Sequence, residues 1–198
     1  MTAVEHAAIL EADPAFVARR EAQERATAAR IAFFRAEQEP ILVELRTMGW
    51  NLIDLGDLRS MPVAYPEAIP VLLKHFHLPY SDGTRYTLAL ALACKEATYL
   101  RPELVVAYRN EPNTLGEKDN LVKDGLAVAL SAIVTRDTIE EHLKLVQDRT
   151  QGESRILLLA PLRRSRNPKI KEALEELASD PDLATEIARW RPRKPKAK

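Results

Sequence analysis

The sequence has few of the residues that mark several common classes of protein. Its single cysteine, Cys94, excludes an internal disulfide, and it has only 6 glycines in 198 residues. Aromatic residues make up 6% of the chain, and no uncharged run approaches the roughly 18 residues of a membrane span. The N-terminus lacks the basic and apolar stretches of a secretion signal. We therefore expect a cytoplasmic protein that contacts no membrane, with Cys94 as a small core residue.

The sequence also lacks the short motifs of catalysis and cofactor binding. It has no Gly-rich phosphate loop, no serine nucleophile elbow and no His-Glu-x-x-His. His75 and His77 are two positions apart, so on a helix they point to different faces, whereas a helical zinc pair needs a spacing of four. We expect no catalytic residue, no metal site and no cofactor.

What the sequence does contain favours helices. Alanine, leucine and glutamate are plentiful, and no extended alternation of Val, Ile and Thr indicates a strand. Proline follows Asp or Asn at residues 13–14, 167–168 and 180–181, which is typical of a capped helix start. These signals predict an all-α protein, with helices over about 14–38, 40–48, 55–59, 66–77, 82–96, 102–110, 119–133, 138–149, 153–164, 168–178 and 181–190.

Three segments of the chain form an internal repeat. They are Arg85–Leu92 (RYTLALAL), Lys123–Leu130 (KDGLAVAL) and Arg155–Leu162 (RILLLAPL), at offsets of 38 and 32 residues. Each begins with a cation, ends in leucine and precedes a second predicted helix. One helical hairpin cannot bury its own apolar face, so stacked hairpins must share a core. Small residues such as Ala89 and Ala127 should allow close helix approach, and Pro161 should distort the third segment.

In register, these segments resemble HEAT repeats, and more narrowly the uncharacterised HEAT-repeat domain proteins of bacteria. The resemblance covers roughly residues 40–190 and implies a short α–α superhelix of about three to four hairpins. Residues 1–39 would then be a long N-terminal helix packed on the solenoid, and 191–198 a basic, disordered tail. The resemblance also implies an inter-repeat ladder made by the cations Arg85, Lys123 and Arg155 with the acidic residues Asp82, Asp119 and Glu153.

The long first helix carries two short apolar groups. Ile31 and Phe34 share one helix face, and we expect them to cap the open end of the repeat array. The alternative is that Phe16 and Val17, at the start of this polar arm, dock a second chain.

The resemblance implies a binding surface along the second helix of each hairpin, which lines the concave face of such solenoids. The side chains expected to point outward there are Lys74, Tyr108, Arg109, Lys144, Gln147 and Lys171. A Tyr/Arg pair among lysines is typical of an interface for an acidic partner. The leading hypothesis is a non-enzymatic protein–protein interaction module, such as an adaptor, a scaffold or an immunity-type inhibitor, that binds an unidentified protein with an acidic surface.

Uneven charge supports a second hypothesis. The last ten residues, 189–198, carry six positive charges and no negative one, so the rest of the chain has a net charge of −6. Residues 163–171 hold five positive charges in nine positions, with Arg163, Arg164, Arg166 and Lys169 as candidate contacts. Together these stretches predict a basic C-terminal end that binds nucleic acid.

An enzyme is the third hypothesis. The chain resembles the HEAT-like DNA glycosylases in fold only. Those enzymes need a carboxylate among aromatic residues and cations on the concave face, whereas here Trp50 and Trp190 flank the repeats.

Overall fold

The computed structural model describes residues 13–113 and 121–190, and within these ranges the chain is helical and contains no β-strand. This confirms the all-α prediction. The chain divides into two compact units, residues 1–40 and residues 41–198. The HEAT-type superhelix and the packing and capping roles of the N-terminal arm stay predictions. The predicted basic tail, 191–198, lies outside the described residues.

The first long helix continues further than its sequence predicts. Helix α2 (Pro14–Thr47) contains Pro40 in its interior, so the prediction that one helix ends before Pro40 and another begins there is wrong. Proline removes one backbone hydrogen bond from a helix. Beyond it, Ile41, Leu42 and Leu45 are buried in the core of the second unit. This burial holds the last turns of α2 in place.

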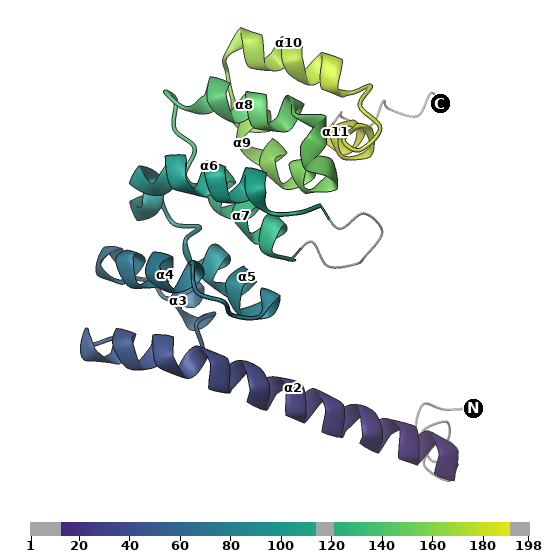
Figure 1. Ribbon diagram of the computed structural model, residues 1–198. Coiled ribbons are helices and arrows are strands. Elements are labelled where there is room, and N and C mark those ends of the chain that lie inside the picture. Colours follow the sequence, from purple (N-terminus) through teal and green to yellow (C-terminus); the bar gives the residue numbers. More distant parts are fainter. Residues whose placement is uncertain (1–12, 114–120, 191–198) are drawn as a thin grey trace. The chain divides into compact units, whose positions relative to one another are not determined.

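The helices of the second unit lie in two rows (Figure 1). The first row consists of α5 (Asp82–Ala91), α7 (Leu121–Ala132), the 3₁₀ helix η3 (Arg149–Leu158) and α9 (Leu159–Arg164). The second row consists of α4 (Ile69–Phe76), α6 (Arg101–Asn110), α8 (Ile139–Gln147) and α10 (Pro168–Leu177). Shorter elements are α3 (Asp57–Ser60), η1 (Pro66–Ala68), η2 (Lys95–Leu100) and α11 (Ala184–Trp190). Within the first row α5 packs on α7 and α7 on η3, while α4, α6 and α8 pack on α5, α7 and η3 respectively.

Small residues bring α5 and α7 into close contact, as the repeat predicts. Ala89, Ala127 and Ala129 are fully buried. Gly125 faces α5 so closely that an added Cβ would lie 2.9 Å from Cδ2 of Tyr86 and 3.0 Å from Cβ of Ala89. No larger residue fits at position 125 unless the two helices move apart.

The third repeat segment is distorted, as Pro161 predicts. Its first half belongs to the 3₁₀ helix η3, and α-helix begins only at Leu159. In an α-helix the carbonyl of Leu157 would accept a hydrogen bond from residue 161, but proline has no N–H. The hydroxyl of Ser131, on α7, donates to that carbonyl instead, at 2.7 Å. Neighbouring repeats are therefore joined at the point where this segment departs from its pattern.

The first repeated cation, Arg85, lies between two second-row helices. Its guanidinium lies 5.4 Å from the ring centre of Phe76, the last residue of α4. It also donates two hydrogen bonds, of 3.1 and 2.8 Å, to the carboxylate of Glu111, the residue that follows α6. Arg85 thus joins the end of one second-row helix to the end of the next.

Lys123 and Arg155 occupy equivalent positions. Lys123 is buried, lies 5.0 Å from the ring centre of Tyr108 and donates to the carbonyl of Glu111 at 2.8 Å. Arg155 is fully buried and donates to the carbonyl of Val146 at 3.1 Å. It also binds both carboxylate oxygens of Asp180 at 3.1 Å. Cations are stabilised at helix C-termini, where unpaired carbonyls gather.

These three cations form a ladder along the second unit, and its carboxylates agree with the predicted ones only in part. Asp82 lies 3.8 Å from Arg85, farther than Glu111, and Asp119 lies outside the described residues. Arg155 pairs with Asp180 and Asp182, not with Glu153. The prediction took the acidic residue nearest in sequence, whereas the partners lie at or just after the ends of second-row helices.

The ladder leads to a prediction about stability. Replacing Arg155 by Met should lower the free energy of unfolding by about 3 kcal/mol, because it leaves the buried carboxylate of Asp180 with the exposed Arg149 as its ionic partner. The double variant Arg155→Met/Asp180→Asn should recover part of this loss. Urea unfolding measures both. As a control, Lys169→Ala removes an exposed contact of 3.5 Å with Glu140 and should cost less than about 1 kcal/mol; similar losses at the two sites would contradict the ladder's role.

Candidate functional site

The structure places the six predicted partner-binding residues in different surroundings. Lys144, Arg109, Gln147 and Lys171 are exposed on α8, α6 and α10. Lys74 is also exposed, but its ammonium group binds the carboxylate of Glu44 on α2 at 2.8 Å. Its charge is therefore already engaged within the second unit.

Tyr108 is fully buried, so the prediction that it points outward is wrong. Its hydroxyl bonds to Oγ of Ser154 at 2.8 Å, and burial raises its pKa to about 12. The apolar stripe of α6 runs through Leu104, and Tyr108 lies one turn later on the same face. Arg101 precedes Leu104 by three residues, a spacing that also places it on this face, and sequence reasoning missed this signal.

A small cavity lies between α6 and α8. It has a volume of about 190 Å³ and is lined by Arg101, Val105, Arg109, Glu141, Lys144 and Leu145. The structure thus brings together two of the predicted residues, Arg109 and Lys144. Val105 and Leu145 give the cavity an apolar part, while three cations and one carboxylate give it a net positive charge. Ligand pockets for cofactor-sized molecules are usually 300–1,000 Å³, so this cavity suits a single side chain.

Arg101 is the unusual member of this cavity. It is 5% exposed, and its three guanidinium nitrogens have no hydrogen-bond partner among the described residues. Burial lowers its pKa, while the charge of Glu141 acts in the opposite direction. A buried guanidinium normally has several partners, because the desolvation of an unpaired charge costs several kcal/mol.

His142 lies on α8 near Arg101. It is fully buried, and its Nε2 donates to the carbonyl of Leu158 at 2.8 Å, which leaves Nδ1 without a partner among the described residues. Burial, with the charge of Arg101 as a smaller cause, lowers the pKa of His142 to about 4. Nδ1 of neutral His142 is therefore a second buried polar atom without a hydrogen-bond partner among the described residues.

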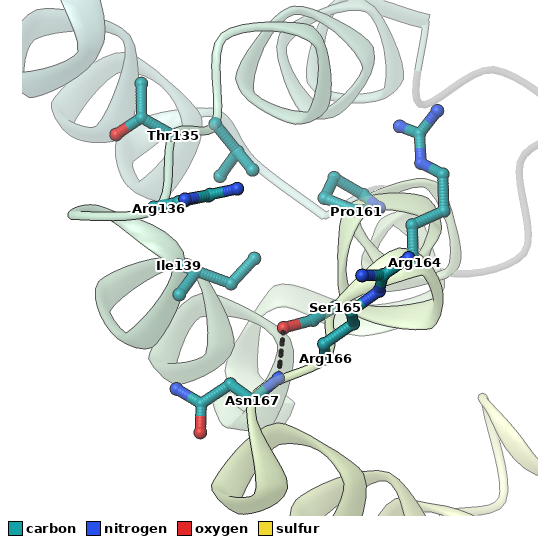
Figure 2. A pocket seen from close by; sticks show the side chains of 9 residues that line it. Thr135, Arg136, Ile139, Pro161, Arg164, Ser165, Arg166 and Asn167 are labelled. Carbon is teal, nitrogen blue, oxygen red and sulfur yellow. Dashed lines mark hydrogen bonds between the residues drawn. The ribbon is translucent and has the colours of Figure 1, made fainter.

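A larger, basic cavity lies between the loops that lead into α8 and α10 (Figure 2). It has a volume of about 700 Å³, and Arg136, Arg164 and Arg166 are among its nine lining residues, none of which is acidic. Ser165 accepts a hydrogen bond from the backbone N–H of Asn167 at 3.2 Å, which fixes the loop before α10 (Figure 2).

Two of the four predicted nucleic-acid contacts, Arg164 and Arg166, line this basic cavity, and the other two do not. The guanidinium of Arg163 lies 5.3 Å from the ring centre of Trp190, and Lys169 lies 3.5 Å from Glu140. Arg136, on the preceding loop, is the contributor that sequence reasoning missed, because it is remote from the basic run at 163–171.

His75, His77 and Cys94 have structural partners. His75 bonds to Glu44 and Tyr80, and His77 to Glu103. Cys94 is half-buried and packs against the core, and burial raises its pKa. Over the parts of the chain that the structure describes, no group of three or more His, Cys, Asp or Glu could hold a metal ion. In those same parts, no helix has the length and apolar character needed to cross a membrane.

Asp124 bears on the enzyme hypothesis. Burial, with the charge of Glu153 as a smaller cause, raises its pKa. A catalytic acid would also need access to substrate. Asp124 lines neither the α6/α8 cavity nor the basic cavity before α8 and α10, so its altered pKa gives no argument for catalysis at either of them.

Comparison with known proteins leaves the class of this chain to be argued from its geometry. No protein-family model, curated protein or solved structure matches the chain. The resemblance to HEAT repeats therefore rests on the repeated segments and stays a prediction.

The buried histidine predicts how stability depends on pH. Because the folded-state pKa of His142 is about 4, below the unfolded value of about 6.5, the unfolded chain binds the proton first. Stability is then complete above about pH 6.5 and falls as the pH drops towards 4. Between pH 7 and pH 4 the wild type should lose about 3 kcal/mol more than His142→Gln, whose amide can still donate to Leu158. Urea unfolding of both proteins at several pH values measures this difference. If the free energy of unfolding depends on pH equally in the two proteins, the prediction is contradicted.

Proposed function

We propose that this protein is a non-enzymatic binding module that holds an acidic segment of a partner protein along the α6/α8 cavity. The observation that carries the proposal is the pairing of Arg109 and Lys144 at one cavity, on neighbouring second-row helices. A cytoplasmic location and a HEAT-type solenoid are parts of the same proposal, and the sequence pattern supports them.

Charge and surroundings favour an acidic protein segment. Arg109 and Lys144 are exposed, and no contact within the described residues neutralises either cation by an ion pair. Val105 and Leu145 lie beside them, so a partner can bury apolar atoms while its carboxylates meet the two cations. Interfaces gain much of their energy from such arginines next to an apolar contact.

A second candidate function is supported by the basic cavity. Arg136, Arg164 and Arg166 line one hollow without a carboxylate among the lining residues, which suits phosphate groups. Aromatic side chains, on which bases would stack, are absent from its lining. The cavity therefore supports contact with a nucleic-acid backbone more than recognition of bases.

Charge reversal tests the leading proposal. Arg109→Glu/Lys144→Glu should lower the affinity for the captured partner about tenfold or more, since both substitutions replace attraction by repulsion. Proteins retained from an extract of the source cell are quantified by mass spectrometry, and the affinity of the selected protein is then measured with purified components. Arg59→Glu/Lys95→Glu is the matched control, because both residues are exposed and line neither cavity. Equal retention by both double variants contradicts the proposal.

The second candidate has its own measurement. If the basic cavity binds nucleic acid, Arg136→Gln/Arg164→Gln/Arg166→Gln should weaken binding of a fluorescein-labelled DNA duplex. It should also reduce the slope of log K against log salt by about 2–3, because each phosphate contact contributes roughly 0.9. Fluorescence anisotropy at several salt concentrations gives both quantities. If the wild type does not bind the duplex at low salt, this function is excluded.

A further inference from the structure

Arg101 differs from the other buried cations of the second unit in what surrounds its charge. Lys123 and Arg155 are equally buried, and each donates to a backbone carbonyl, with Arg155 also bound to two aspartates. Arg101 has none of these contacts among the described residues. The bonds of the ladder cations account for their burial, whereas no such bonds account for the burial of Arg101.

The setting of Arg101 indicates what would complete it. It lines the α6/α8 cavity together with Arg109 and Lys144. Glu141 is the one acidic residue among the lining residues, and the charge of Asp148 also acts on Arg109. An anionic group in the cavity would accept hydrogen bonds from a guanidinium that otherwise has no acceptor. Pairing a buried charge recovers the desolvation cost that leaving it unpaired incurs.

We propose that Arg101 is the receptor for a side-chain carboxylate, an Asp or Glu of an acidic partner segment that inserts into the α6/α8 cavity. This inference rests on the proposed function and names the chemical group that the cavity takes. The guanidinium nitrogens of Arg101 are enclosed by protein, so the side chain turns towards the cavity as the partner's carboxylate enters. Arg109 and Lys144, which are exposed, meet further acidic side chains of the same segment.

Size and shape of the cavity favour a carboxylate over other anions. A volume of about 190 Å³ holds a carboxylate with its methylene stem and excludes a nucleotide. Val105 and Leu145 provide apolar contact for that stem. The planar guanidinium matches a planar carboxylate through two parallel hydrogen bonds. Glu141 opposes the additional charge of a phosphate dianion.

The partner segment also needs more than one acidic residue. Arg101 and Arg109 are eight residues apart on α6, which corresponds to a rise of about 12 Å along the helix axis. Together with Lys144 they provide three positive charges against one negative charge from Glu141. A segment with acidic residues on both sides of the inserted carboxylate balances this excess.

The test follows the Arg101 side chain directly. The Nε–Hε resonance of Arg101 in the ¹⁵N-labelled full chain is identified by its loss in Arg101→Leu, and it is titrated with the blocked peptide acetyl-Glu-Leu-Glu-Leu-Glu-amide. The control peptide has Gln in place of each Glu. A third peptide carries phosphoserine in place of the central Glu. The expected result is a saturable shift with the Glu peptide and affinity at least about tenfold weaker for the Gln peptide, because an ion pair is replaced by a hydrogen bond from the guanidinium to an uncharged amide.

Variants separate a receptor from a residue that only supports the fold. Arg101→Leu should remain folded, since replacing a buried unpaired charge by an apolar side chain is neutral or stabilising, and it should bind the Glu peptide at least about tenfold more weakly. Arg101→Lys keeps the charge without the planar fork and should weaken binding less than Leu does. Arg59→Gln, whose residue lines neither cavity, should bind as the wild type does. If Arg101→Leu unfolds, the Arg101→Lys affinity decides the question, and unchanged affinity overturns the proposal.

Three other results would also overturn it. Equal affinity for the Glu and Gln peptides means that carboxylate charge is not recognised. Tighter binding of the phosphoserine peptide assigns the cavity to phosphate instead. If no peptide shifts the resonance, Arg101 does not receive a carboxylate in this cavity. If partner capture still depends on Arg109 and Lys144 in that case, the proposed function remains. If instead the Glu peptide binds at Arg101 but partner capture does not depend on Arg109 and Lys144, the carboxylate site remains and the proposed function is contradicted.

Discussion

The contact of a buried or half-buried cation with the end of a second-row helix is the interaction on which the second unit depends. Arg85, Lys123 and Arg155 begin the three repeated segments and contact successive second-row helices at their last turns. Each contact places a charge where unpaired carbonyls gather, and the carboxylates of Glu111 and Asp180 offset the desolvation of two of these cations. Apolar packing supplies most of the energy of such a core, but it does not fix the register of one hairpin on the next. Directional bonds at each repeat do fix it.

Comparison with the ladder cations shows how Arg101 in the α6/α8 cavity differs from them. All three ladder cations begin repeated segments of the first row, and their charges are used within the fold. Arg101 begins α6, in the second row, and is buried without comparable partners among the described residues. The two rows therefore use their cations differently. The first-row cations join helices to one another, whereas the second-row cations line a positively charged cavity between α6 and α8.

The sequence predicted the fold class and most helices because periodicity and proline placement are local signals. Asn167 accepts from the backbone N–H of Lys169, and Asp13 from that of Ala15, as expected of N-caps. Pro40 was misjudged because the helix continues into buried residues, and this tertiary burial outweighs the loss of one hydrogen bond.

The candidate site was predicted only in part, because it depends on which helix face is buried. Arg109 and Lys144 were placed correctly on one surface, whereas Tyr108 was assigned to the wrong face. Arg101 was missed because a charged residue in an apolar stripe is normally assigned to solvent. Arg136 was missed because its neighbours in space, Arg164 and Arg166, are distant in sequence. Such pairings require the fold itself.

The short sequence separation of the ladder bonds has a consequence for how the chain folds during synthesis. The bonds from Arg85 to Glu111, Lys123 to Glu111 and Arg155 to Asp180 span 26, 12 and 25 residues. Closing such loops costs little entropy, and proteins dominated by nearby contacts fold quickly. Each rung can form as soon as the next helix has left the ribosome, without waiting for the C-terminal end. By the same reasoning, one end of the second unit can unfold locally while the ladder bonds at the other end stay formed. The cooperativity of unfolding therefore depends on the bonds between neighbouring repeats.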